Sequence, residues 1–290
     1  MPAELQIRPD FAIDDNTLSS VDLTACTLLV LVGHGQFSYA VLDTSGNRFI
    51  GVKSYQIPSG QKWRTELDLI ERCFDTDKML YTAFRRIQVA FNVHKNVLVP
   101  GSIYSPLNKK DTLYLIHGEG PDEKVMTDQA VGLDMINIYA VNRNILGNLK
   151  KEFSGAVLCH AVTPLLTALM KQNDPEIPTL CLLPGNQWFH MLVFREGKLT
   201  YQQQIRFTAP SDILYHALNV LRVLELPSDS IRVSLGGETR QNPAISALLK
   251  QYFPHISQLE RPAGYSYIDP FNVYPSGYFY HLFTLAPCAS

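Results

Sequence analysis

The sequence predicts an α/β protein of two duplicated domains, each with a mixed β-sheet that has helices on both faces. Three observations predict this class. Short apolar runs alternate with longer stretches of helical spacing along the chain. Each half opens with three strands joined by short turns, which run antiparallel, and continues with helix–strand units, which add parallel strands. The same order of elements restarts after the proline-containing segment 173–178, and 290 residues suit two domains.

The first half begins with an apolar strand over 27–33. The turn sequence "TSGN" at 44–47 then joins strands 36–43 and 48–57 into a hairpin. A helix is predicted from about Lys62, because Trp63, Leu67, Ile70 and Phe74 recur at helical spacing. The rest of this half is predicted as strands 85–93, 135–141 and 156–160 and helices 142–152 and 161–172, with an irregular segment near 94–133 that contains the strand-like runs "VLVP" and "LYLIHG".

The second half repeats the plan of the first. The stretch "TLLVLVGHGQFSYAVLDTSG" lies over "TLCLLPGNQWFHMLVFREG" with one residue deleted, so that Gly33 corresponds to Gly185. We therefore predict a first domain over 1–172, with the irregular insertion, and a second over 173–290, with an aromatic-rich C-terminal tail. The elements of the second half are predicted as strands 179–185, 187–194, 199–207 and 231–235, a helix from Pro210 to Pro227, and a helix capped by Asn242.

Composition and motifs exclude several classes of function. The formal net charge is −2 and no Lys/Arg run occurs, which argues against nucleic-acid binding. The apolar run around 28–32 is far shorter than the ~20 residues of a membrane span. Five cysteines without a CxxC pair indicate reduced thiols and a cytoplasmic protein. No Cys/His metal spacing, GxxxxGK[ST], HExxH or GxSxG motif is present.

The segment "IRVSLGGETRQNP" at 231–243 places two glycines between a strand and a helix. Glycine lets the backbone approach a flat ligand because it has no Cβ, and a guanidinium group stacks well on aromatic rings. This motif and the duplicated plan resemble the actin-like ATPase superfamily, which includes Hsp70 chaperones, sugar kinases and PilM. The resemblance implies two actin-like, ribonuclease H-like domains that flank an ATP-binding cleft. It extends in element order from about residue 27 to 260.

The resemblance assigns roles to specific residues. Gly236 and Gly237 would lie against the adenosine, Thr239 belongs to the same motif, and Arg240 would cover the base. The chain also looks like an uncharacterised bacterial family of this superfamily, by its "FAIDDNTL" opening at 11–18 and "VLVPGSIY" at 97–104.

The two phosphate loops of such a fold follow the first strand of each domain and usually begin with an aspartate that holds Mg²⁺ through water. Here Leu31 and Leu183 stand two residues before the loop glycines, where that acid is expected. His34 could bind phosphate or act as a base, or it could be a solvent-facing turn residue. The remaining candidates for the phosphate part of the site are Gly33, Gly35, Gly185 and Asn186.

We therefore expect a degenerate, non-hydrolysing ATPase homologue that acts as an interaction or scaffold protein with an unknown protein partner. No catalytic residue or metal ligand is assigned, and ATP is the candidate cofactor. One alternative is an active ATPase or kinase with diverged loops; another is a structural adaptor in which the glycine pair is only a turn. The aromatic tail over 261–290 either completes the hydrophobic core or forms a docking patch.

Overall fold

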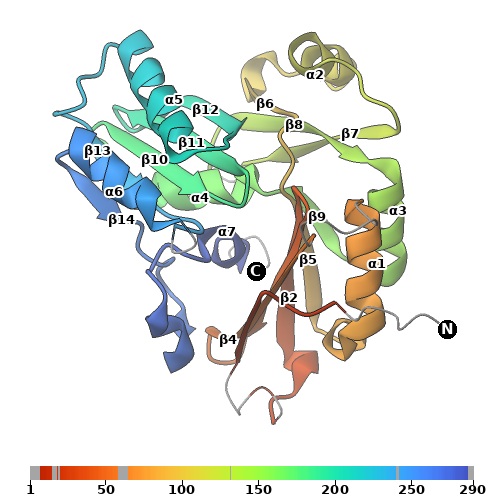
Figure 1. The fold of residues 1–290 in the computed structure, drawn as a ribbon. Helices are drawn as coiled ribbons and strands as arrows, with labels where there is room; N and C mark the ends of the chain where they lie inside the picture. The colour runs from red at the N-terminus through yellow and green to blue at the C-terminus, as the bar shows by residue number, and fades with distance from the viewer. Residues whose placement is uncertain are drawn as a thin grey trace. The chain divides into compact units, whose positions relative to one another are not determined.

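The computed structural model describes residues 7–14, 18, 20–57, 65–130, 132–239 and 242–286. Trp63 and Arg240 lie outside these residues. The chain forms two compact units (Figure 1). The first contains the chain up to Thr167, Gly264–Phe271 and the residues from Thr284, and the second contains Ala168–Ala263 and Asn272–Phe283. The C-terminal tail, predicted as part of the second domain, is thus shared between the units.

The first unit is built on a mixed sheet with the strand order β1-β4-β3-β2-β5-β9, and a short strand, β15, also pairs with β4. The strands β2, β3 and β4 run antiparallel, whereas β5 is parallel to β2 and β9 is parallel to β5. The strand bounds are β1 Phe11–Asp14, β2 Cys26–Gly33, β3 Gln36–Asp43, β4 Arg48–Gln56, β5 Arg86–Phe91, β9 Val157–His160 and β15 Ser266–Tyr267.

Helix α1 (Glu66–Thr76) packs on β3 of this sheet, beside α3 (Arg143–Glu152) (Figure 1). Its start is fixed by a capping box, in which the Thr65 side chain accepts the amide of Asp68 and the Asp68 carboxylate accepts the amide of Thr65. The helix therefore begins four residues after the predicted Lys62. Phe74 packs edge-on against Phe37, with 6.2 Å between ring centroids. The other helices of this half are η1 Leu23–Ala25, η2 Lys78–Tyr81 and α4 Val162–Gln172, the last of which crosses the boundary between the units.

The segment predicted to be irregular is a regular insertion. Its strands β6 and β7 form an antiparallel sheet with β8, the predicted strand that follows, in the order β6-β8-β7, and α2 packs on this sheet through the buried Leu113. The run "LYLIHG" is therefore helical and not strand-like. Its apolar pattern was misleading because Leu115 and Ile116 point to solvent, 88% and 63% exposed. The bounds are β6 Asn96–Pro100, η3 Gly101–Ile103, α2 Lys109–His117, β7 Glu123–Gln129 and β8 Met135–Asn142.

The second unit repeats the topology of the first. Its strand order, β12-β11-β10-β13-β14, matches β4-β3-β2-β5-β9, with the same two antiparallel and two parallel pairs of neighbouring strands. The predicted duplication is confirmed. The bounds are β10 Thr179–Pro184, β11 Trp188–Arg195, β12 Lys198–Arg206, α5 Pro210–Val223, β13 Arg232–Leu235, α6 Pro243–Tyr252, β14 Ile256–Gln258, η4 Asp269–Val273 and α7 Tyr280–Phe283, with η4 shared between the units.

Helices cover both faces of the second sheet. On one face α5 and α6 lie side by side (Figure 1) and bury Leu221 and Leu249 against Met191 and Val233. On the other face α7 brings His281 against a strand residue, His190, with 4.7 Å between ring centroids. Alternate side chains of β11 therefore enter two different apolar layers.

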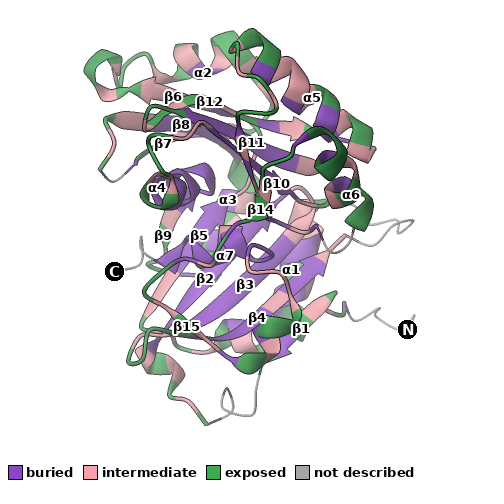
Figure 2. Ribbon diagram, turned by 90° about the vertical axis from the view of Figure 1, so that its left-hand side faces the viewer, coloured by how far each residue is buried: buried purple, intermediate pink, exposed green. Residues whose placement is uncertain are grey.

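The C-terminal aromatic residues are mostly buried, which confirms that the tail completes the core. Phe271, Tyr278, Tyr280 and Phe283 expose 3% or less of their surface. Figure 2 shows how completely the central strands are buried. The described cysteines, Cys26, Cys73, Cys159 and Cys181, are buried free thiols, as predicted; Cys288 lies outside the described residues. Within the described chain, no helix has the length and apolar character that a membrane crossing requires.

Candidate functional site

The first predicted phosphate loop is a two-residue hairpin turn at the carboxyl end of β2. Gly33 pairs with Gln36, and the turn residues His34 and Gly35 have φ values of 53° and 73°. Positive φ at both central residues is typical of a type I′ turn. At Gly33 a Cβ would lie 1.9 Å from the carbonyl oxygen of Asn92, so the end of β5 requires glycine there. The loop geometry is thus set by the sheet itself.

A carboxylate of the same chain already binds the amides of this loop. Glu66, the first residue of α1, accepts the Gly35 amide through Oε1 at 2.8 Å. Burial raises the pKa of Glu66, and hydrogen bonds from the amides of Gly35 and His34 oppose that rise. The helical spacing of Leu67, Ile70 and Phe74 gives no reason to place Glu66 at this loop. Its real direction follows from its place at the helix start, which only the fold aligns with the loop.

Histidines gather at the carboxyl edge of the first sheet. The rings of His34 and His94 have their centroids 6.2 Å apart, and His94 lies 6.4 Å from His117. Burial and the neighbouring His117 lower the pKa of His94. The turn role of His34 is confirmed, but its side chain is half-buried and not solvent-facing. Among the described residues, no group of three or more His, Cys, Asp or Glu side chains is arranged to hold a metal ion.

Asp128, which the sequence gave no reason to single out, lies half-buried at the same edge. It lies on β7 of the insertion, and its carboxylate accepts the Tyr139 hydroxyl at 2.9 Å, the Thr163 hydroxyl at 3.1 Å and the amide of His160. Burial raises the pKa of Asp128 even though these hydrogen bonds lower it. With three donors directed at it, this carboxylate ties the insertion to the start of α4. No sequence motif predicts this cluster of hydrogen bonds, because the partners of Asp128 are 11 to 35 positions away in the chain.

The second predicted loop lies at the corresponding edge of the second sheet. The Gly185 amide donates to the carbonyl of Trp188 at 2.8 Å, and Asn186 is exposed. Arg206, at the end of β12, reaches the loop, with Nη2 3.4 Å from Gln187 Oε1. The loop sequence contains no cation, so the sequence alone did not connect an arginine with this site. A hairpin register places it there.

The glycine pair is required by packing within the second unit. A Cβ at Gly237, which has a φ of 71°, would lie 2.2 Å from the Pro184 carbonyl oxygen. A Cβ at Gly236 would lie 2.8 Å from a methyl carbon of Leu259. The atoms that approach these glycines closely, a backbone carbonyl at Gly237 and a side-chain methyl at Gly236, therefore belong to the chain itself. This observation favours the turn interpretation for the pair, and the adenosine contact stays a prediction.

The fold brings part of the predicted set together. The amide of Glu238 donates to the Pro184 carbonyl at 2.7 Å, so the loop at Gly185 and Asn186 lies beside the glycine pair. Thr239 is buried, and its amide donates to the carbonyl of Gly237 at 2.9 Å. Gly33, His34 and Gly35 form the separate loop of the first unit. Leu31 and Leu183, in the positions expected for acids, are buried apolar side chains.

Two sheets that share an order of five strands, each with a glycine-containing hairpin after the corresponding strand, β2 or β10, define an actin-like ATPase fold. A Bacteroides thetaiotaomicron protein with this fold and unknown function is similar in structure, with a TM-score of 0.73 and 14% identity over 82% of this chain and 93% of that one. A structure of the PilM–PilN type IV pilus biogenesis complex matches with a TM-score of 0.61 and 12% identity over 91% and 98% of the two chains. The chain belongs to the family of proteins of unknown function DUF3822, whose model matches residues 15–256. No curated protein matches it.

Proposed function

We propose that this chain is a cytoplasmic, non-hydrolysing member of the actin-like ATPase superfamily that acts as an interaction or scaffold protein. The observation that carries the proposal is the contact between Glu66 and the first phosphate loop. The Gly35 amide, which would face a phosphate in an active member, donates instead to a carboxylate of the same chain. A phosphate brought to this loop would meet a like charge as well as a donor already in use.

The leucines in the positions expected for acids also support the proposal. Mg²⁺ binds hard oxygen ligands, and a buried leucine offers none. Leu31 is 7% exposed and Leu183 is fully buried, so neither position lies open to a hydrated ion. Phosphoryl transfer depends on neutralising the charge that develops on the phosphate oxygens. Two loops that lack the metal anchor, the first of which already binds a carboxylate, are therefore poorly suited to it.

Unfolding measurements with ATP, ADP and GTP, with and without Mg²⁺, test this proposal. A ligand at 100 times its Kd adds about 2.7 kcal/mol to the free energy of unfolding. For the natural chain we expect no Mg²⁺-dependent stabilisation and no phosphate release. A Mg²⁺-dependent rise in stability together with phosphate release would show an active enzyme and reject the proposal.

Replacement of Glu66 tests the contact between this carboxylate and the first phosphate loop directly. Glu66→Ala removes the internal anion, so pyrophosphate should stabilise this variant more than it stabilises the natural chain. Glu71→Ala, on the exposed face of the same helix, is the matched control and should behave like the natural chain. If Glu66→Ala gains no anion binding, the carboxylate is not what keeps phosphate from the loop.

A surface for a protein partner lies on the insertion. Four apolar side chains of the segment that contains α2 are 63–91% exposed: Ile103, Leu107, Leu115 and Ile116. PilM, a similar fold, is seen in complex with PilN. A photo-reactive amino acid at Leu115 should crosslink a cellular protein, whereas one at Tyr215, an exposed residue of α5, should not. Equal crosslinking at both positions would remove the support for a specific partner on α2.

One observation favours the alternative of an active ATPase or kinase. The Arg206 guanidinium lies beside the second loop and could neutralise a phosphate where an acid-bound metal is missing. If phosphate release is detected, Arg206→Ala should reduce it at least about tenfold. An unchanged rate in that variant would exclude Arg206 from the chemistry.

A further inference from the structure

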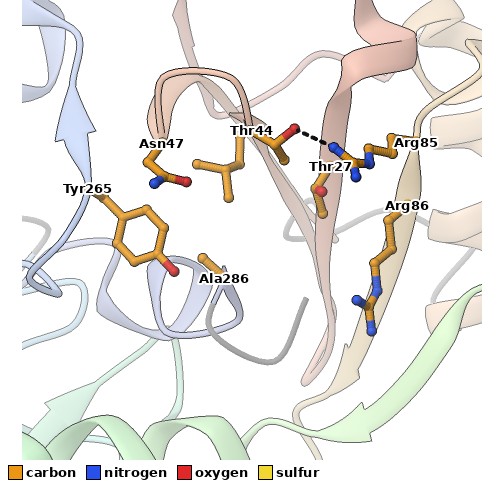
Figure 3. Close-up of a pocket in the computed structure, with 8 residues that line it drawn as sticks. Thr27, Thr44, Asn47, Arg85, Arg86, Tyr265 and Ala286 are labelled. Carbon is orange, nitrogen blue, oxygen red and sulfur yellow. Dashed lines mark hydrogen bonds between the residues drawn. The ribbon is translucent and has the colours of Figure 1, made fainter. Parts of the chain in front are cut away.

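A pocket of about 320 Å³ lies in the first unit at the amino ends of β2 and β5, the opposite edge of the sheet from the predicted loop (Figure 3). In α/β sheets, ligands usually bind beyond the carboxyl ends of the strands. The pocket is therefore separate from the nucleotide site that the resemblance implies. Its lining residues are Thr27, Leu42, Thr44, Asn47, Arg85, Arg86, Tyr265 and Ala286.

The register of the sheet explains why these residues meet. Thr27 on β2 is the neighbour of Arg86 on β5 and of Leu42 on β3, so the three side chains lie on one face of the sheet. Leu42 in turn pairs with Phe49 on β4. The Phe49 ring packs edge-on against Tyr265, with 5.4 Å between centroids, and this contact holds the tyrosine at the pocket. Strands far apart in sequence thus build one wall.

The charged wall comes from two consecutive arginines. Arg85 lies just before β5, and its Nη1 is 3.5 Å from Thr44 Oγ1 (Figure 3). The Thr44 hydroxyl donates its own proton to the carbonyl of Ala25 at 2.5 Å, which leaves a lone pair toward the arginine. Arg86 extends from the start of β5 on the same side of the pocket as Arg85, opposite Asn47 and Tyr265 (Figure 3). The described residues around the pocket bring two guanidinium groups and no carboxylate.

The neighbouring acid is already engaged. Asp43, which precedes Thr44, accepts the amide of Ser45 at 2.9 Å and its hydroxyl at 2.6 Å, both through Oδ1. It closes the predicted turn after β3. The asparagine and tyrosine of the lining add a side-chain amide and a phenol to the polar groups of the pocket.

We propose that this pocket binds a small anionic molecule that carries phosphate or carboxylate groups. Guanidinium groups match both oxyanions by paired hydrogen bonds, and ligand pockets commonly begin at about 300 Å³. A partly enclosed space with two positive charges concentrates anions. Leu42 and Ala286 supply the apolar contact for the rest of such a molecule. The site does not depend on the proposed loss of ATP hydrolysis.

Isothermal calorimetry on the full chain, at low ionic strength held constant with chloride, tests the site. Pyrophosphate and citrate are the two probes, since they distinguish phosphate from carboxylate recognition. We expect saturable binding of at least one probe. Arg86→Ala and the Arg85→Ala/Arg86→Ala double variant should bind it about ten- to a hundredfold more weakly. Arg195→Ala, at an exposed arginine of the second unit, should bind as tightly as the natural chain.

A conservative variant covers the case in which alanine prevents folding. Arg86→Lys keeps the charge but loses the paired donors, so it should fold and still bind more weakly than the natural chain. Binding of pyrophosphate alone would identify a phosphate-bearing ligand, and binding of citrate alone a carboxylate-bearing one. Absence of binding to both probes, or equal affinity in the natural chain and the arginine variants, would overturn the proposal.

Discussion

Acidification should destabilise the first unit through one buried histidine, His160. This residue ends β9 and is fully buried. Its Nε2 lies 2.9 Å from the carbonyl oxygen of Val93, and its Nδ1 lies 3.1 Å from the amide nitrogen of Val162. An amide can only donate, so Nδ1 must accept and Nε2 must carry the proton. The neutral ring satisfies both partners, whereas a proton on Nδ1 would face an N–H group.

The magnitude follows from the pKa. Burial lowers the pKa of His160 to about 4. The hydrogen bond to Val93 opposes this decrease, and the nearby His34 adds to it. An unfolded histidine titrates near ~6.5. Because the folded pKa is the lower one, the neutral ring makes its full contribution to stability above pH ~6.5, and this contribution is lost as pH falls toward 4. This residue alone should cost ~2 kcal/mol between pH 7.5 and 5, and ~3 kcal/mol in all.

Urea unfolding at pH 7.5 and pH 5 measures the effect in the natural chain and in His160→Gln. The variant should be less stable at pH 7.5, since a cavity and a weaker hydrogen-bond pair remain, but its loss on acidification should be smaller by ~2 kcal/mol. His281, in the second unit, has a pKa lowered to about 4 by burial and continues to titrate in both proteins. If both proteins lose the same stability between the two pH values, the assignment of the neutral ring is wrong.

Three further variants test packing and charge. Gly237→Ala should cost at least about 2 kcal/mol of stability by urea unfolding, because of its positive φ and the nearby carbonyl. The control Gly264→Ala should cost less, since Gly264 has a φ of 88° but no atom lies within 4 Å of the added Cβ. Equal losses in the two variants would contradict the packing role of Gly237. Asp77→Asn should lower the free energy of unfolding by ~1.5–3 kcal/mol and flatten the acid side of the pH–stability curve. Burial by itself raises the pKa of Asp77, but the hydroxyls of Tyr39 and Tyr55 and the Lys53 ammonium group outweigh it and lower that pKa, so the carboxylate stabilises the fold until pH falls through it. An unchanged curve would show that the charge of Asp77 does not contribute to stability. Leu113→Ala should cost ~2–5 kcal/mol and Leu115→Ala almost nothing in thermal unfolding, and the reverse order would mean that α2 faces the other way.

Turns, strands and helices could be predicted from the sequence wherever residues that are neighbours in the chain decide the structure. The "TSGN" turn joins β3 and β4 as predicted, and Asp43 closes it by accepting the amide and the hydroxyl of Ser45. Period-two and period-3.6 apolar patterns reflect which side chains one sheet or helix buries, so strands such as Cys26–Gly33 and helices such as Pro210–Val223 were predicted. The repeat of those patterns also revealed the duplication, because strand order follows from turn lengths and crossover helices.

Contacts between distant segments were decided by the tertiary structure. The interaction of Glu66 with Gly35 spans 31 positions, and that of Asp128 with His160 spans 32. A carboxylate on a helix looks the same in sequence whether it faces water or a loop, because its direction depends on where the helix packs. For the same reason the insertion was taken as irregular: Leu115 and Ile116 are exposed, which no apolar pattern can announce. The sequence by itself determined the two-unit α/β fold and the absence of acids from its loops. The tertiary structure alone decided which charged side chains lie at those loops and at the pocket on the other edge, because their placement depends on strand register and helix docking.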